Sequence, residues 1–136
     1  MIQTIFFIAI LVYASIIDIK AQTVPTHIYI LLLIVGLINI GPLSFLGAVF
    51  TFLPLFIVAF STNELGGGDV KLGTMCGFVL QGVYGIIGTM IGVIFALIII
   101  SLSRTIRHEK VNAPFPLVPY LSTGYITILL LKILVR

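Results

Sequence analysis

Charged side chains are scarce in this sequence, and their scarcity excludes several functions. Only 8% of the 136 residues are charged, with seven basic and four acidic side chains, and tryptophan is absent. A net charge of +3 does not provide the extended basic surface that binds nucleic acids, so no nucleic-acid partner is expected. Apolar residues make up 60% of the chain, and the mean hydropathy is +1.32. This balance is typical of helical membrane proteins in contact with lipid.

Cysteine and histidine are also rare. The single cysteine, Cys76, excludes an intrachain disulfide and a CxxC metal site, and its apolar surroundings predict a buried, unreactive thiol. His27 and His108 stand alone, without the spacing of metal ligands. We therefore expect neither a metal ion nor another cofactor.

Long apolar runs dominate the sequence. They predict six membrane-spanning helices over 2–19, 26–40, 43–60, 69–81, 83–102 and 117–135. In the fifth, Gly85, Gly88 and Gly92 recur every three to four residues, which indicates a helix face for close packing. The expected fold is an all-α integral membrane bundle that forms one domain over 1–136. The oligomeric state is not predicted.

The distribution of basic residues predicts the orientation in the membrane. Six spans put three polar connections on one side, and these connections carry Lys20, Lys71, Arg104, Arg107 and Lys110. The other side carries Lys132 and Arg136. By the positive-inside rule, the three connections face the cytoplasm and both termini lie outside the cytoplasmic (inner) membrane.

The four acidic residues, Asp18, Glu64, Asp69 and Glu109, all fall on the predicted cytoplasmic side. Asp18 ends the first apolar segment and Asp69 begins the fourth, so helix packing can bring them together. Two carboxyl groups that share one proton can activate a water molecule for peptide hydrolysis. The simpler alternative is a charge at a helix end. Asp69 gains roughly 0.3–1 kcal/mol from a helix N-terminus, whereas Asp18 lies at the unfavourable C-terminal end of its own helix.

The residues beside Asp69 are unusual for a membrane helix. Gly66, Gly67 and Gly68 precede it and can form a tight turn or allow a substrate backbone to approach. Lys71 and Lys20 are candidates for binding an acidic group of a substrate or for biasing the charge of the acid pair. The alternative for both lysines is anchoring of the topology.

Three motifs resemble those of the type IV prepilin peptidases, a family of membrane-embedded aspartic peptidases. The sequence GGGDVKL at 66–72 resembles the family's GxGD-x-K-L signature. The stretch DIKAQTVP at 18–25 is similar to its first catalytic motif, and APFPLVP at 113–119 resembles the proline-rich entry to its last helix. These motifs extend over most of the chain in the family's order.

The resemblance implies a specific activity. Such a peptidase would remove the leader of prepilins or pseudopilins at the cytoplasmic face, just before their hydrophobic helix. Asp18 and Asp69 would form the catalytic dyad, and Gly66 and Gly68 would shape the loop. The cysteine-containing insertion of larger members has no counterpart here, so methyltransferase activity is not expected. The chain looks more like the short peptidase-only members of tight-adherence (Flp-type) pilus systems.

Two other readings remain open from the sequence. One is a presenilin-like intramembrane aspartic protease, although those place the first aspartate in a Tyr-Asp context, and here it follows Ile17. The other is a small non-enzymatic membrane subunit that uses Asp18 and Asp69 as an ion or proton site. Cleavage ahead of a substrate's hydrophobic helix, cleavage within it, or proton-coupled flux distinguishes the three.

Overall fold

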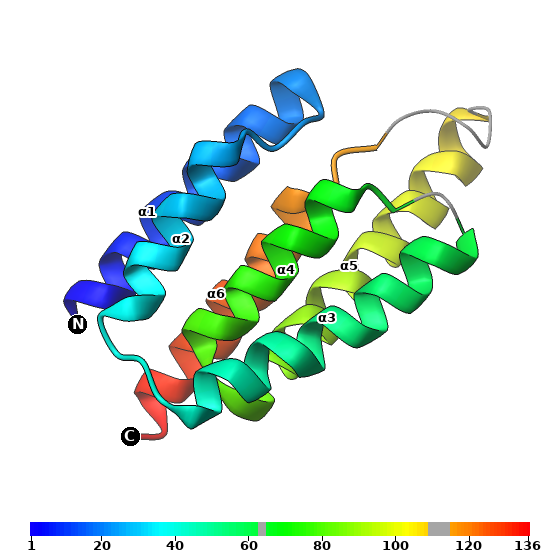
Figure 1. Cartoon of the computed structure of the whole chain (residues 1–136). Helices are drawn as coiled ribbons and strands as arrows, with labels where there is room; N and C mark the ends of the chain where they lie inside the picture. Colours follow the sequence, from blue (N-terminus) through cyan, green and yellow to red (C-terminus); the bar gives the residue numbers. More distant parts are fainter. Residues whose placement is uncertain (63–64, 109–114) are drawn as a thin grey trace.

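The computed structural model describes residues 1–62, 65–108 and 115–136, and this part of the chain folds into helices joined by short connections. The helices are α1 (Ile2–Ala21), α2 (Thr26–Leu37), α3 (Pro42–Thr62), α4 (Gly67–Leu80), α5 (Gly82–Arg107) and α6 (Val118–Leu134). They run alternately up and down, and both termini lie at the same end (Figure 1). The predicted all-helical architecture is confirmed.

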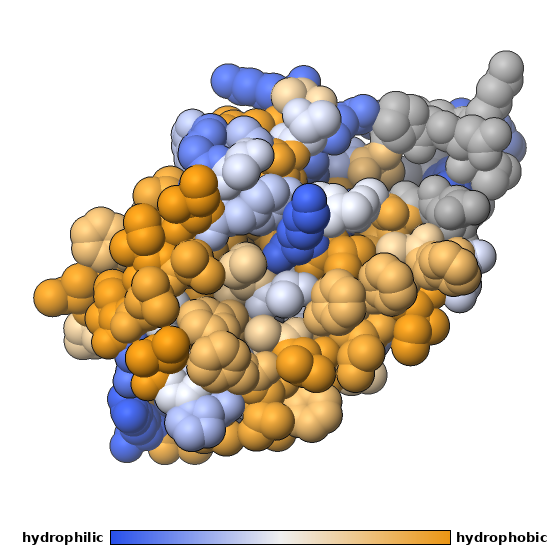
Figure 2. Space-filling view, in the orientation of Figure 1, coloured by the Kyte–Doolittle hydropathy of each residue, from blue (hydrophilic) through white to orange (hydrophobic). Residues whose placement is uncertain are grey.

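The lengths of the helices differ from those of six uniform spans. Helices α1, α3 and α5 are long and apolar enough to cross a membrane, whereas α2 and α6 are apolar but only 12 and 17 residues long. Large apolar side chains are exposed along the bundle, for example Phe45, Ile57 and Leu97 at about 60%. They cover most of the face in Figure 2, and hydrophilic residues gather at its two ends. Such a surface fits lipid rather than water, while the crossing of all six helices stays a prediction.

Most helix boundaries differ from the predicted ones by one to three residues, as in α2, which ends at Leu37 and not at 40, and two of the differences concern the polar connections. Helix α4 begins at Gly67, so two of the three glycines lie inside it, because a first turn needs few intrahelical hydrogen bonds and tolerates glycine. Helix α5 continues to Arg107, beyond the predicted end at 102, so the expected polar loop from 104 starts as helix. Arginines at a helix C-terminus complement its dipole. Glu64, Glu109 and Lys110 lie outside the described residues.

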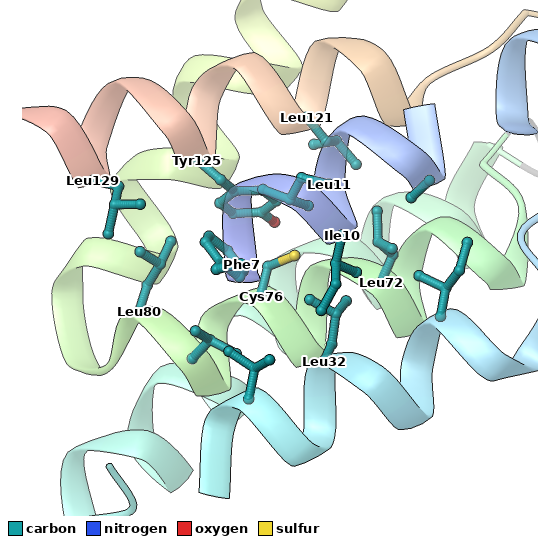
Figure 3. Close-up of a cluster of buried hydrophobic side chains, with 14 of the residues drawn as sticks. Phe7, Ile10, Leu11, Leu32, Leu72, Cys76, Leu80, Leu121, Tyr125 and Leu129 are labelled. Atoms are coloured by element: carbon teal, nitrogen blue, oxygen red, sulfur yellow. The ribbon is translucent and has the colours of Figure 1, made fainter. Parts of the chain in front are cut away.

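Helix α4 occupies the centre of the bundle and contacts α2, α3, α5 and α6. Its residues Leu72, Cys76 and Leu80 are four apart and therefore share one face, and all three are buried. Figure 3 shows this face within the core cluster, together with Phe7, Ile10 and Leu11 of α1, Leu32 of α2, and Leu121, Tyr125 and Leu129 of α6. The predicted burial of Cys76 is confirmed, and the central position of α4 fixes where its first turn lies.

Glycines allow α5 to pack closely on its neighbours, as their spacing predicts. Gly85, Gly88 and Gly92 are all buried. A Cβ atom on Gly85 would lie 2.7 Å from the Cα atom of Gly77 in α4, and one on Gly92 would lie 2.7 Å from the Cα atom of Leu121 in α6. The backbones of α4, α5 and α6 therefore approach to distances that any larger residue would prevent.

We predict that Gly92→Ala destabilises the protein by about 1–3 kcal/mol, because the new methyl group would press against the α6 backbone, which cannot move aside as a side chain can. Gly41→Ala is the matched control, since a Cβ atom there has no neighbour within 4 Å. Thermal unfolding in detergent measures both variants. Equal midpoints for the two would contradict the close packing of α5 on α6.

Candidate active site

The side chain of Asp18 is buried in the last turn of α1, with 4% of its surface exposed. Its Oδ2 atom accepts a hydrogen bond of 3.0 Å from the backbone N–H of Val118, the first residue of α6. The first N–H groups of a helix have no intrahelical acceptor and attract negative charge. Asp18 lies at the unfavourable C-terminal end of its own helix, as expected, but it also lies at the favourable N-terminus of α6, which is distant in sequence.

A second contact between α1 and α6 supports this arrangement one turn deeper. The Ser15 hydroxyl donates a 2.9 Å hydrogen bond to the Ser122 hydroxyl, which in turn donates to the carbonyl of Val118. The two helices are thus joined at successive polar positions in an otherwise apolar contact. This pairing fixes the depth at which the Asp18 carboxylate lies.

Asp69 lies in the first turn of α4, outside the three helices that qualify as membrane spans. Its backbone N–H donates to the carbonyl of Gly66, the residue of extended conformation that precedes α4 as its N-cap. The pKa of the Asp69 carboxyl is raised to about 6, chiefly because burial disfavours its charged form and also because the charge of Asp18 lies nearby. A hydrogen bond from the Gly66 backbone partly opposes this rise in the pKa.

Both carboxylates line one cavity of about 360 Å³, which is large enough for water and part of a peptide. The rest of its wall comes from residues 22–24 between α1 and α2, from Gly66 and Gly68, and from Phe115 and Leu117 ahead of α6. The site thus combines two acids, a glycine turn and an apolar wall at one end of the bundle. Among the residues that the structure describes, no three His, Cys, Asp or Glu side chains gather into a metal site.

The sequence-predicted site residues divide into two groups. Asp18, Asp69, Gly66 and Gly68 line the cavity. Gly67, Lys71 and Lys20 do not line it; they are exposed, and a Cβ atom on Gly67 would have no neighbour within 4 Å. In this structure neither lysine is therefore placed to contact a molecule inside the cavity directly.

Sequence reasoning missed some parts of the site. The N–H donor of Val118 is a backbone group and has no signature of its own, although the proline-rich stretch 113–119 marked the region. The Tyr29 hydroxyl, which donates a 3.1 Å hydrogen bond to the carbonyl of Gly68, had no signal in the sequence either. Both contacts depend on helix packing rather than on a local pattern.

Comparison with known protein families assigns the chain to one family. The family model of the type IV leader peptidases matches residues 5–102, which is most of the chain and includes both aspartates. The chain belongs to the type IV leader peptidase family. No protein of curated function and no solved structure matches it. In this leader peptidase family member, helix α6 and the cavity residues Phe115 and Leu117 lie outside the matched range.

We predict that Asp69 loses a proton near pH 6 and that Asp18→Asn lowers this midpoint. Removing the neighbouring negative charge favours the ionised form of Asp69, so its pKa falls. A hydrophobic carbodiimide, which reacts with protonated carboxyl groups, reports the midpoint when labelling at Asp69 is followed against pH by mass spectrometry.

Tyr13→Phe is the control for this experiment, because it removes an exposed hydroxyl of α1, which pairs with His27, without changing the charge. It should leave the Asp69 midpoint unchanged. A midpoint that stays constant or rises in Asp18→Asn would show that the two carboxyl groups do not interact.

Proposed function

We propose that this leader peptidase family member is an aspartic endopeptidase of the inner membrane that removes the leader of a prepilin or pseudopilin at the cytoplasmic face. The observation that carries the proposal is the single cavity lined by two carboxylates, Asp18 and Asp69, at a polar end of an apolar bundle. Family membership supplies the reaction class, and the two acids supply a mechanism.

The chemistry follows from one proton held between two carboxyl groups. The ionised carboxylate accepts a proton from water, and the oxygen of that water attacks the peptide carbonyl. The protonated carboxyl donates to the carbonyl oxygen as negative charge develops there. Collapse of the tetrahedral intermediate breaks the C–N bond, and a proton passes to the leaving amine. The raised pKa of Asp69, about 6, supports a proton shared by the pair at mildly acidic pH, up to about pH 6, and the titration belongs to both groups together.

The position of the cavity supports cleavage ahead of a substrate's hydrophobic helix rather than within it. Asp69 is in the first turn of α4 and Asp18 is in the last turn of α1, so both belong to helix ends. Gly66 leaves the wall beside Asp69 without a side chain, since a Cβ atom there would lie 3.3 Å from the Asp69 Oδ2 atom, and this gives an extended peptide backbone room to approach. A presenilin-like cut inside a membrane span would require a deeper site.

The charge distribution supports a cytoplasmic active site. Lys20 and Lys71 lie at the same end as the cavity, as do Arg104 and Arg107 in the last turn of α5, whereas Lys132 is in the last turn of α6 at the opposite end (Figure 1). Basic residues are enriched on the cytoplasmic side of membrane proteins. The orientation therefore puts the proposed dyad where a leader that precedes a membrane helix would be cut.

We predict that Asp18→Asn and Asp69→Asn each abolish leader cleavage, with a loss of at least about 10³-fold, while the protein still accumulates in the membrane. Asparagine keeps the size of each side chain but can neither accept the proton of water nor share one. Cleavage of a membrane-embedded prepilin is followed by mass spectrometry of the released leader and the new N-terminus.

Each alternative predicts a different outcome, either in this cleavage assay or in a measurement of proton flux. Substantial cleavage by either variant would remove that residue from the dyad. A new N-terminus inside the substrate's hydrophobic helix would favour a presenilin-like protease. Proton-coupled flux in vesicles without any processing would favour a transport subunit.

We also predict a bell-shaped dependence of cleavage on pH. Activity should fall at low pH, where both carboxyl groups are protonated and no base remains, and at high pH, where both are ionised and no acid remains. Initial rates with a purified prepilin are measured below saturation and at saturation. They separate the pKa values of the free enzyme from those of the enzyme–substrate complex. A rate below saturation that is flat across several pH units would contradict the shared proton.

A further inference from the structure

Tyr29 of α2 contacts the glycine turn. It lies in the first turn of α2, is half-buried, and donates a hydrogen bond of 3.1 Å from its hydroxyl to the carbonyl oxygen of Gly68. Its side chain is not part of the cavity wall, which Gly68 and Asp69 line. Tyr29 therefore acts on the site through the backbone and not through contact with a molecule in the cavity.

The bonded carbonyl belongs to the peptide unit that joins Gly68 to Asp69. Fixing this peptide plane fixes the direction in which the Asp69 side chain leaves the backbone. No side-chain cap secures the N-terminus of α4, where the backbone N–H groups of Asp69 and Val70 donate to the Gly66 carbonyl. The Tyr29 hydroxyl thus supplies an attachment to a separate helix.

The absence of a side chain at position 68 fits this contact. A Cβ atom on Gly68 would lie 3.0 Å from the Tyr29 hydroxyl oxygen, closer than ordinary van der Waals contact, and its next neighbour would be 4.0 Å away. The backbone of Gly68 does not have a positive φ, so its conformation does not itself require glycine. Glycine at this position is explained by the approach of Tyr29.

The chemistry of the hydroxyl limits what it can do. The charges of Asp69 and Asp18 both act on Tyr29, so its hydroxyl lies within the electrostatic field of the acid pair. A phenol has one proton to donate, and here that proton is engaged with the Gly68 carbonyl. This arrangement does not leave Tyr29 a proton for the acids or for a substrate.

We infer that Tyr29 is a positioning residue, whose hydrogen bond from α2 holds the Gly68–Asp69 peptide so that the Asp69 carboxyl is set against Asp18. This inference rests on the proposed function for its effect on catalysis. Its effect on Asp69 itself can be measured without any substrate.

The first test is Tyr29→Phe, which removes only the hydroxyl. We expect kcat for leader cleavage to fall about tenfold, the size expected for one lost hydrogen bond, with KM changed by less than about twofold. Tyr13→Phe is the matched control, because the Tyr13 hydroxyl is exposed and pairs with His27 at 3.3 Å, away from the glycine turn. Unchanged kcat in Tyr29→Phe would overturn the inference. Failure of this variant to accumulate would also overturn it, by showing that the hydroxyl serves the fold.

A double-mutant cycle tests the contact itself. Gly68→Ala should lower kcat in the wild type, because its Cβ atom displaces the Tyr29 hydroxyl or the turn. In the Tyr29→Phe background, where that oxygen is absent, the same substitution should cost about threefold less. Strict additivity of the two losses would show that Tyr29 and Gly68 act independently.

The substrate-free readout is carbodiimide labelling of Asp69. If the peptide loosens, Asp69 gains water and moves away from Asp18, so both causes of its raised pKa weaken and the labelling midpoint of Tyr29→Phe shifts to lower pH. A midpoint equal to that of Tyr13→Phe overturns the inference, whether or not cleavage is observed. A shifted midpoint in a protein that cleaves no prepilin would support the inference and count against the proposed function instead.

Discussion

The hydrogen bond from the Val118 backbone to the Asp18 carboxylate is the interaction on which the rest of the site depends. A carboxylate buried at the end of an apolar helix is costly unless a donor satisfies it. The N-terminus of α6 provides such a donor, and one of its own unpaired N–H groups, that of Val118, is satisfied in return. The bond joins residues one hundred positions apart in the sequence and fixes one wall of the cavity. Asp69 lines the same cavity from the first turn of α4.

Close packing of backbones brings Asp69 there. Helix α4 is only 14 residues long, and it lies among four other helices because glycines remove the side chains that would keep them apart. Its buried face of Leu72, Cys76 and Leu80 sets its rotation within the core. Once the depth and rotation of α4 are set, the first turn and Asp69 have little freedom. The packing of the apolar core therefore also determines the position of Asp69 in the polar site.

The sequence was sufficient for the features that depend on local patterns. Hydrophobic runs predicted the order of the helices, and the spacing of the α5 glycines predicted a tightly packed face. The positions of Asp18 and Asp69 at helix ends led us to expect that they come together, and the structure has both at one cavity. The glycines on either side of Gly67 also belong to that cavity.

The features that depend on tertiary contacts could not be predicted from local sequence patterns. The donor of Val118 is a backbone group, and any residue except proline carries one. Tyr29 looks like an ordinary residue of an apolar helix until α2 packs beside α4. Lys20 and Lys71 are close to the aspartates in sequence, yet the turns of their helices expose them outside the cavity. Distance along the chain was a poor guide to which side chains share the site.

The most direct test of the central claim, that two aspartates from α1 and α4 form one acid pair, is to cross-link their positions. Asp18→Cys and Asp69→Cys are combined with Cys76→Ala, treated in native membranes with a short thiol-specific cross-linker, and examined by mass spectrometry. Ser15→Cys with Ser122→Cys is the positive control, because the two hydroxyl oxygens lie 2.9 Å apart. The account predicts that both pairs are cross-linked within single chains. Cross-linking of the control pair without any at positions 18 and 69 would contradict it.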